Sequence, residues 1–436
     1  MTVKDDDRGA QSSISNRRPV GDERRLDSRT EMAAAPILVL LPAPLASLEA
    51  AGGAEGYGER MILGLSLIRR AVLAARRAGY GQVIVLSATP DAAAGAAEAG
   101  SWRSFAATLK SQPAAPLVIA PGAILAQTGW LERLREARIE PAAWAAIPNR
   151  IVIIAAGSAL SALDALDEKG GAREMSAVES ELERRFGPPA AVLPGVDPMT
   201  VETPADVGRA ERRLMQSLVK DTDGFMARHV ERPISLTISR VLAPTAITPN
   251  EMSVISIIVG LVGAPFFVSG RASLQTIGAL LFLAHSILDG CDGELARLKF
   301  EESRWGGVLD FWGDNVVHAA IFACMGVGWS LTAGAGWPLL LGAAAVLGAL
   351  GSAGLVYWRL MRGKDDGGAL FTSVSADPGR PLARALDSAS RRDFIYLVLL
   401  LALAGKSNWF LVLAALGAPI YFCLLVFLAA REGSSR

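Results

Sequence analysis

Residues 288–314 read LDGCDGELARLKFEESRWGGVLDFWGD, and this stretch decides how the second half of the chain is interpreted. It holds four aspartates, Asp289, Asp292, Asp310 and Asp314, in a region that is otherwise apolar enough to cross a bilayer. An unpaired charge at the centre of a membrane costs at least ~2.5–3.5 kcal/mol, so carboxylates there mark functional sites. The two pairs are spaced i, i+3 and i, i+4, which places each pair on one helical face. We therefore predict two neighbouring helices that direct four carboxylates into one pocket.

Six apolar runs follow Asn250, and each is a candidate membrane span. A helical span needs ~17–25 mostly apolar residues, a length that all but the fifth run reach. Several arginines precede the first run and occur within residues 359–392. The short connections after the first, third and fifth runs contain only two basic residues, Arg271 and Lys406. Because cytoplasmic loops are enriched in Lys and Arg, we predict six spans in a bacterial-type cell membrane, with both termini and the aspartates cytoplasmic. The runs are 251–269, 272–290, 308–331, 337–358, 393–405 and 408–430.

The acidic stretch has the composition expected of a site for divalent cations. Cations stabilise carboxylates that would otherwise repel one another, and an all-oxygen ligand set suits Mg²⁺ or Mn²⁺. A pair of such cations suggests phosphoryl transfer, because the metals neutralise the charge on a pyrophosphate leaving group. Gly293 and Gly306 remove side chains where a bulky ligand must approach the backbone, and Arg297 offers a bidentate grip on phosphate. Charges that merely cap helix ends would explain any one of these aspartates more easily than four in register.

The first half of the chain has a different pattern, in which short apolar runs alternate with helical, Ala- and Arg-rich stretches. This alternation predicts a soluble α/β domain with a parallel sheet over residues 35–220. Residues 1–34 are charged and lack the apolar core of a signal peptide, so we expect a disordered cytosolic tail. Residues 221–250 interleave arginines with apolar residues, which is typical of amphipathic helices on a membrane surface; an ordinary linker helix is the alternative. The predicted parallel strands are 36–41, 82–87, 116–121 and 150–157.

Charge and cysteine content exclude other classes of protein. Lys and Arg total 43 and Asp and Glu total 43, so net charge gives no sign of a nucleic-acid partner. The three cysteines fit neither a metal site nor a disulfide framework; they are Cys291, Cys324 and Cys423. His285 and His318 each lie one helical turn from an aspartate, and we expect them to be packed polar residues rather than partners of the site.

The string Asp289-x2-Asp292-Gly293-x2-Ala296-Arg297-x8-Gly306-x3-Asp310-x3-Asp314 resembles the full signature of the CDP-alcohol phosphatidyltransferase family. Its eight fixed residues over 26 positions all agree. The resemblance covers residues 221–430 and implies an all-α domain of six transmembrane helices over 251–431, usually in a homodimer. Members of the family use the hydroxyl of one alcohol to displace CMP from a CDP-linked alcohol.

The resemblance also implies a role for each position of the site. Asp289, Asp292 and Asp310 would bind two divalent cations, and Asp314 would complete the site and act as the general base on the acceptor hydroxyl. The positions that would line the nucleotide pocket are Gly293, Ala296, Arg297 and Gly306, with Asn250 nearby. Arg391 and Arg392 resemble the family's basic pocket for a phosphorylated acceptor.

The soluble half resembles sugar-phosphate nucleotidyltransferases. The stretch GLSLIRRAVLAARRAGYGQVIVLSA (64–88) is similar to the first helix and second strand of that fold. The stretch VETPADVGRAERRL (201–214) is similar to its closing element, with Glu202 where an acidic metal ligand is expected. Fusion of such a domain to a CDP-alcohol transferase resembles the bifunctional inositol-phosphate cytidylyltransferase/di-inositol-phosphate phosphate synthases, in which the soluble half makes CDP-inositol and the membrane half uses it.

The catalytic parts of a nucleotidyltransferase are nevertheless mostly absent from the soluble half. Such enzymes need a Gly-rich loop with an arginine directly after strand one and a lysine to hold the triphosphate. Here the glycines and Arg60 lie too far from the first strand, and no lysine occurs between Lys4 and Lys110. No aspartate occurs between Asp91 and Asp164, where a metal ligand is expected. We therefore expect a degenerate domain with a structural or regulatory role.

The leading hypothesis is a membrane transferase that moves a phospho-alcohol group from CDP-diacylglycerol or a CDP-polyol to a second alcohol or phospho-alcohol and releases CMP. One alternative is a bifunctional enzyme whose soluble domain also makes the CDP-alcohol from CTP. A more remote alternative is a divalent cation transporter, although transporters usually place such sites at the midplane and carry internal repeats. An inactive scaffold is disfavoured by the intact signature.

Overall fold

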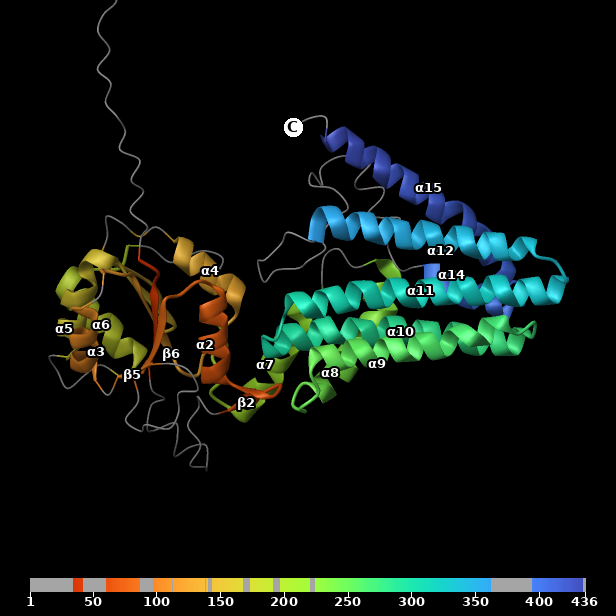
Figure 1. The fold of residues 1–436 in the computed structure, drawn as a ribbon. Coiled ribbons are helices and arrows are strands. Elements are labelled where there is room, and N and C mark those ends of the chain that lie inside the picture. The colour runs from red at the N-terminus through yellow and green to blue at the C-terminus, as the bar shows by residue number, and fades with distance from the viewer. Residues whose placement is uncertain are drawn as a thin grey trace, which may run out of the picture.

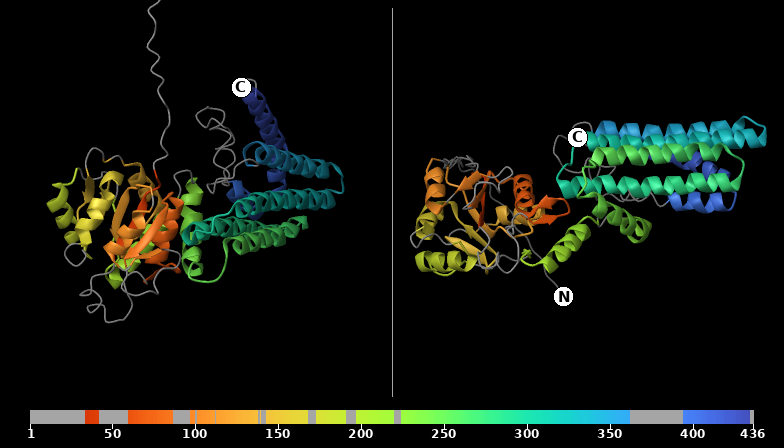
Figure 2. Two further views of the ribbon diagram at one scale, coloured as in Figure 1. Left: turned by 60° about the vertical axis from the view of Figure 1, so that its left-hand side comes forward. Right: turned by 90° about the horizontal axis from the view of Figure 1, so that it is seen from below.

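The structure is a computed structural model with an α/β domain followed by a bundle of long helices (Figure 1). Two turned views show the same two bodies, with the elements after residue 200 running from one to the other (Figure 2). The residues that the structure describes are 34–41, 60–86, 97–99, 101–111, 113–137, 139, 143–167, 173–190, 197–219, 224–361 and 394–433.

A six-stranded mixed sheet with the order β5-β4-β1-β6-β8-β7 forms the centre of the α/β domain. Strand β1 (Ile37–Leu41) pairs in parallel with β4 (Gln82–Leu86) and with β6 (Leu117–Pro121). Strand β5 (Ala97–Ala99) adds a further parallel pair next to β4. All five residues of β1 are buried, as expected for a strand in a sheet with both faces covered.

One strand, β8, runs against the others and corrects the prediction of an all-parallel sheet. Strand β8 (Ile151–Ile154) is antiparallel to β6 and to β7 (Trp144–Ile147), so the expectation of a parallel strand over 150–157 is wrong. The reason is the short connection after β7, where Asn149 has a φ of 57°. A tight turn joins antiparallel strands, whereas a parallel pair needs a crossover of a dozen or more residues.

Helices cover both faces of this sheet (Figure 1). Helices α2 (Leu67–Arg77) and α4 (Thr128–Glu136) share one apolar cluster with one face of the sheet. The cluster on the other face includes residues of α3 (Trp102–Leu109), α5 (Ala159–Asp167) and α6 (Met175–Phe186). Helix α5 follows a short 3₁₀ turn, η2 (Ala156–Ser158).

A third apolar cluster joins the α/β domain to the helical bundle. From the α/β side it contains residues of α7 (Pro204–Ser217) and of the hairpin formed by β2 (Met61–Ile62) and β3 (Leu65–Ser66). From the bundle side it contains Met252, Leu295 and Leu298 among others. The hairpin lies close to the bundle, because a Cβ on Gly64 would be 2.5 Å from the carbonyl oxygen of Ala243. The two domains therefore share a buried core.

The described part of the segment between the domains is helical and packs on the bundle. A π-helical turn, η3 (Ala227–Glu231), leads into α8 (Arg232–Leu242), and α8 contacts α10. Apolar side chains on this segment are exposed, namely Phe225, Ile234 and Val241. Such exposure agrees with a position on a membrane surface.

The bundle consists of long apolar helices. Five of the described helices are long and apolar enough to cross a membrane, and α14 (Phe394–Leu403) is apolar but shorter. The predicted runs match these helices, but α10 and α11 extend beyond the runs, so the aspartates lie inside helices rather than at their ends. The five are α9 (Pro249–Gly263) with η4 (Ala264–Val268), α10 (Ala272–Lys299), α11 (Arg304–Ala333), α12 (Trp337–Val356) with η5 (Tyr357–Met361), and α15 (Ser407–Gly433).

Candidate metal and nucleotide site

A four-residue turn, 300–303, positions the two acidic helices relative to each other. Helix α10 ends in a left-handed residue, Phe300, with a φ of 59°. Helix α11 begins at an N-cap, Ser303, whose hydroxyl accepts a hydrogen bond of 3.0 Å from the backbone N–H of Gly306. Helix α9 packs against both α10 and α11. These local features bring the acidic faces of two consecutive helices toward one another.

Three of the four predicted carboxylates meet at one point. Asp289, Asp292 and Asp310 each offer a carboxylate oxygen, and these oxygens lie within 4.8 Å of one another. Asp289 and Asp292 are buried, and Asp310 is partly exposed. Two unit charges at 4.8 Å repel by about 3.5 kcal/mol at an effective dielectric constant of 20. A hard divalent cation would offset this repulsion, and the all-oxygen donor set fits one.

Asp314 lies next to this cluster and contacts a histidine. Its Oδ1 is 3.3 Å from Nε2 of His285, and Nδ1 of His285 is 2.9 Å from the backbone carbonyl oxygen of Ser256. A carbonyl oxygen only accepts hydrogen bonds, so Nδ1 carries a proton and the imidazole is fixed between α9 and α11. His285 is thus a packed polar residue, as expected, that also lies against the site. His318 instead makes edge contacts with aromatic rings, at 5.4 Å from those of Phe282 and Phe394.

The first turn of α9 brings two more polar side chains to the site. Thr248 and Glu251 form a capping box, so the helix begins at a defined residue next to the acids. Ser253 donates a hydrogen bond to Asp292. A Cβ on Gly306 would lie 2.8 Å from Oδ1 of Asn250, so these two predicted residues meet although they are far apart in sequence. The absence of a side chain at position 306 leaves space for the asparagine.

The nucleotide-pocket residues predicted on α10 also gather there. A Cβ on Gly293 would lie 3.3 Å from Nη1 of Arg297, so the guanidinium extends over the glycine. Ala296 is buried, and its carbonyl oxygen accepts the N–H of Phe300 and of Glu301 at the end of the helix. Arg297 therefore lies on the same helix as Asp289 and Asp292, with its guanidinium over Gly293.

A buried glutamate that the sequence interpretation missed fixes α8 to α10. Glu294 is fully buried, and its carboxylate accepts hydrogen bonds of 2.7 Å from Arg232, Ser235 and Ser239. These hydrogen bonds hold α8 against α10. The available signal was a third acidic residue just after the apolar run, off the helical face of Asp289 and Asp292.

For two of the remaining predicted residues the structure gives no position. Arg391 and Arg392 fall outside the described residues. In the soluble half, Glu202 is exposed, and its backbone N–H donates to Asp206. Strand β6 is followed by Gly122 and Ala123 rather than by an aspartate.

These observations define a class of protein: an integral membrane protein with an acidic site suited to divalent cations and an α/β domain packed on it. Residues 246–418 match the sequence model of the family described as CDP-alcohol phosphatidyltransferase. This part of the chain is therefore similar to that family, in agreement with the resemblance of the signature.

Two curated relatives have names that join two activities. The chain is 36% identical over 147 residues to the bifunctional IPC transferase and DIPP synthase of Thermococcus kodakarensis, covering 34% of this chain and 33% of that protein. It is 37% identical over 161 residues to the protein of the same name from Rubrobacter xylanophilus, covering 36% of each. The matched part thus spans about a third of the length of these relatives.

One solved structure is a further match. It is a crystal structure of the phosphatidylinositol phosphate synthase of Mycobacterium tuberculosis with CDP-DAG bound. The identity is 20%, the TM-score is 0.32, and the match covers 45% of this chain and 94% of the other. A likeness at this TM-score supports no statement about the site.

Proposed function

We propose that the helical domain transfers a phospho-alcohol group from a CDP-alcohol to the hydroxyl of a second alcohol, with release of CMP. The observation that supports this most directly is the meeting of Asp289, Asp292 and Asp310 within 4.8 Å, beside Arg297 and inside a complete family signature. The donor is CDP-diacylglycerol or a CDP-polyol, and the acceptor is an alcohol or a phospho-alcohol.

Each side chain of the site has a proposed task. Asp289, Asp292 and Asp310 hold two divalent cations, Mg²⁺ or Mn²⁺, and Asp314 completes this ligand set. The cations supply charge neutralisation at the pyrophosphate when they are bound. Asp314 takes the proton from the acceptor hydroxyl. His285, whose Nδ1 donates to the carbonyl of Ser256, would orient the Asp314 carboxylate from Nε2 when both ring nitrogens carry a proton.

The nucleotide would be bound by the surrounding backbone and side chains. Gly293 and Gly306 allow the cytidine diphosphate to approach the helices closely, Ala296 keeps the wall of the pocket small, and Arg297 grips a phosphate. Asn250 would lie against this pocket from α9. Arg391 and Arg392 remain the proposed pocket for the phosphate of a phosphorylated acceptor.

We also propose the topology and assembly of the domain. Six spans place both termini and the acidic site in the cytoplasm, and the short apolar helix Phe394–Leu403 would be part of the fifth. The proposed division of the chain is 1–34 as a tail, 35–220 as the soluble domain, 221–250 as the interfacial segment and 251–431 as the membrane domain. A homodimer is the proposed assembly.

The direct test is CMP release by the purified full-length chain. The protein would be incubated with Mg²⁺ or Mn²⁺ and a panel of CDP-alcohols and acceptors. Release should depend on the metal and should be lost in Asp314→Asn, while Asp164→Asn, a change at an exposed aspartate on α5, should be silent. No CMP from any pair of substrates, or full activity of Asp314→Asn, would refute the proposed reaction.

A second candidate activity is synthesis of the CDP-alcohol by the soluble domain, because the curated relatives are bifunctional. Residues 122 and 123, directly after β6, supply no carboxylate, and this favours a degenerate domain. The measurement is pyrophosphate release by the full-length protein from CTP and a panel of sugar and polyol phosphates. Robust release would establish the bifunctional alternative.

A further inference from the structure

The turn between the two acidic helices is in contact with the soluble domain. Phe300, at the centre of this contact, packs against the apolar cluster formed by α2, α4 and one face of the sheet. Its left-handed backbone costs roughly 1–2 kcal/mol for a residue other than glycine, a cost that this packing can offset. Phe300, the residue directly after α10, is therefore partly buried in the neighbouring domain.

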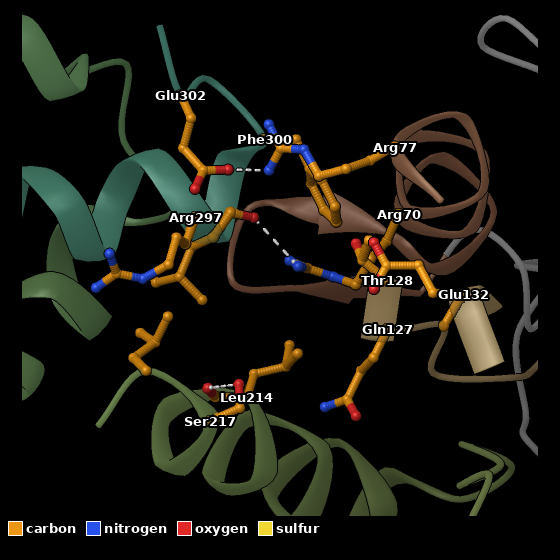
Figure 3. Close-up of a pocket in the computed structure, with 13 residues that line it drawn as sticks. Arg70, Arg77, Gln127, Thr128, Glu132, Leu214, Ser217, Arg297, Phe300 and Glu302 are labelled. Atoms are coloured by element: carbon orange, nitrogen blue, oxygen red, sulfur yellow. Dashed lines mark hydrogen bonds and ion pairs between the residues drawn. The ribbon is translucent and has the colours of Figure 1, made fainter. Parts of the chain in front are cut away.

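Two arginines of α2 hold this phenylalanine. Arg70 and Arg77 are seven residues apart and thus lie on one face of the helix. Their guanidinium carbons are 5.8 Å and 5.4 Å from the centre of the Phe300 ring, within the range of a cation–π interaction. Figure 3 shows the ring between α2 and the end of α10.

Arg70 also connects the two domains through hydrogen bonds. It is 1% exposed, and it donates to the carbonyl oxygen of Leu298 at 3.1 Å and to that of Ile62 at 2.9 Å. The carbonyls of the last helical turn have no partner within the helix, and a cation is favourable there. Burial lowers the pKa of Arg70 to about 10, which still leaves it charged at neutral pH. Arg70 of the soluble domain thus caps a carbonyl in the last turn of α10.

A third contact reaches the turn itself. Arg77 forms an ion pair with Glu302, which lies between α10 and α11 (Figure 3). Both partners are about a third exposed. Contacts from α2 therefore reach positions 298, 300 and 302, and this turn follows Asp289 and Asp292 and precedes Asp310 and Asp314.

We propose that the degenerate soluble domain is a positioning device for the membrane site. Its helix α2, through Arg70 and Arg77, fixes the 300–303 turn and thereby sets the distance between the acidic pair on α10 and the acidic pair on α11. The inference rests on the proposed function for what the site does, but the contacts that carry it are independent of the substrate. Because the connection has only four residues, a shift of the turn displaces one pair relative to the other. A misplacement of 1 Å can cost roughly 100-fold in rate.

The contact between α2 and the 300–303 turn involves few side chains, so it can be tested one residue at a time. A cavity of about 590 Å³ lies beside it, lined by Arg70, Arg77, Gln127, Thr128 and Phe300 among others. In Figure 3 the Arg297 guanidinium points away from Arg70 and Phe300. The cavity leaves one side of this contact without packed neighbours, so single substitutions at Phe300 or Arg77 should loosen the turn.

The test measures binding of Mn²⁺ alone to the full-length protein in detergent, by electron paramagnetic resonance, alongside CMP release. We expect Phe300→Ala and Arg77→Glu to weaken Mn²⁺ binding several-fold and to lower kcat about tenfold to 100-fold. Arg69→Met, a change at an exposed neighbour on α2, is the matched control and should bind Mn²⁺ like the wild type.

Charge reversal separates positioning from misfolding. Arg77→Glu combined with Glu302→Arg rebuilds the ion pair with opposite polarity, so the double variant should recover most of the Mn²⁺ affinity that each single variant loses. If Phe300→Ala does not fold, this reversal cycle decides the question. Equal Mn²⁺ affinity in the wild type, Arg77→Glu and Glu302→Arg would overturn the positioning role. Failure of the wild type to bind Mn²⁺ would instead refute the proposed metal site, and binding without CMP release would refute only the proposed reaction.

Discussion

Replacement of Asp310 by asparagine should stabilise the metal-free protein and abolish its activity. Asp310 is the partly exposed member of the group of three carboxylates whose oxygens lie within 4.8 Å of one another. At about 3.5 kcal/mol per pair, its repulsions with Asp289 and Asp292 sum to about 7 kcal/mol. A carboxylate can escape repulsion by taking up a proton, which costs an ordinary aspartate about 4 kcal/mol at pH 7. The stabilisation from Asp310→Asn in the absence of metal is therefore at most about 4 kcal/mol.

Divalent cations should remove most of this difference in stability. A ligand at 100 times its Kd stabilises the folded state by about 2.7 kcal/mol, and the wild type gains this while Asp310→Asn gains little. Since 1 kcal/mol shifts Tm by about 2–4 °C in a domain of 150–250 residues, both differences are measurable.

The assay is thermal unfolding in detergent, followed by tryptophan fluorescence, in EDTA and in saturating Mn²⁺. The variant should melt above the wild type in EDTA and should lose most of this advantage in Mn²⁺, and CMP release should be absent in both conditions. Asp164→Asn is again the matched control. A wild type whose Tm ignores Mn²⁺, or a variant that still releases CMP, would refute the reasoning.

Three further predictions concern the surroundings of the site. Gly306→Ala should lower turnover with little change in Tm, because its Cβ would lie 2.8 Å from Oδ1 of Asn250 and displace that side chain; a kinetic comparison with Gly417→Ala, where a Cβ meets nothing within 4 Å, checks it. Glu294→Ala should destabilise the protein by about 3–5 kcal/mol, because it leaves the Arg232 charge partly buried without its carboxylate, as unfolding in detergent would show. Asp206→Asn should reduce the loss of stability that the wild-type protein shows as the pH falls into the acid range. Hydrogen bonds from the backbone and hydroxyl of Thr203 hold the pKa of Asp206 below its usual value. The ionised Asp206 carboxylate therefore stabilises the folded wild-type protein above the ordinary aspartate pKa, and this stabilisation is lost as pH falls through the lowered pKa. Melting between pH 2 and 7 measures it, and parallel profiles for the two proteins would contradict it.

The elements with the strongest apolar signal were predictable from the sequence. Strands β1, β4 and β6 begin and end within one residue of the predicted runs, because a strand buried on both faces is a continuous apolar stretch. The direction of β8 was not predictable from that signal, since an apolar run does not indicate whether a strand is parallel or antiparallel to its neighbours. The tight turn at Asn149 decided it.

The site was predictable as a set of residues, but its supports were not. The spacing of the aspartates gave the shared helical faces, and the signature gave the neighbours on α10. The bond between Arg70 and Leu298 joins residues 228 positions apart and depends on Phe300 adopting a left-handed conformation that few non-glycine residues take. Glu294 and His285 contact groups brought together only by helix packing, so their partners could not be named from the sequence.

The length of α10 determines which molecules can reach the acids. Its 28 residues extend about 42 Å, whereas the hydrocarbon layer is about 30 Å thick. With Ala272 at one boundary of that layer, Asp289 and Asp292 lie about 26–30 Å along the helix, at the opposite boundary. The last two turns, up to Lys299, then stand among the lipid head groups and in water. In the proposed reaction, a donor anchored by acyl chains and an acceptor dissolved in the aqueous phase would then approach the same carboxylates from opposite directions, without either leaving its own medium.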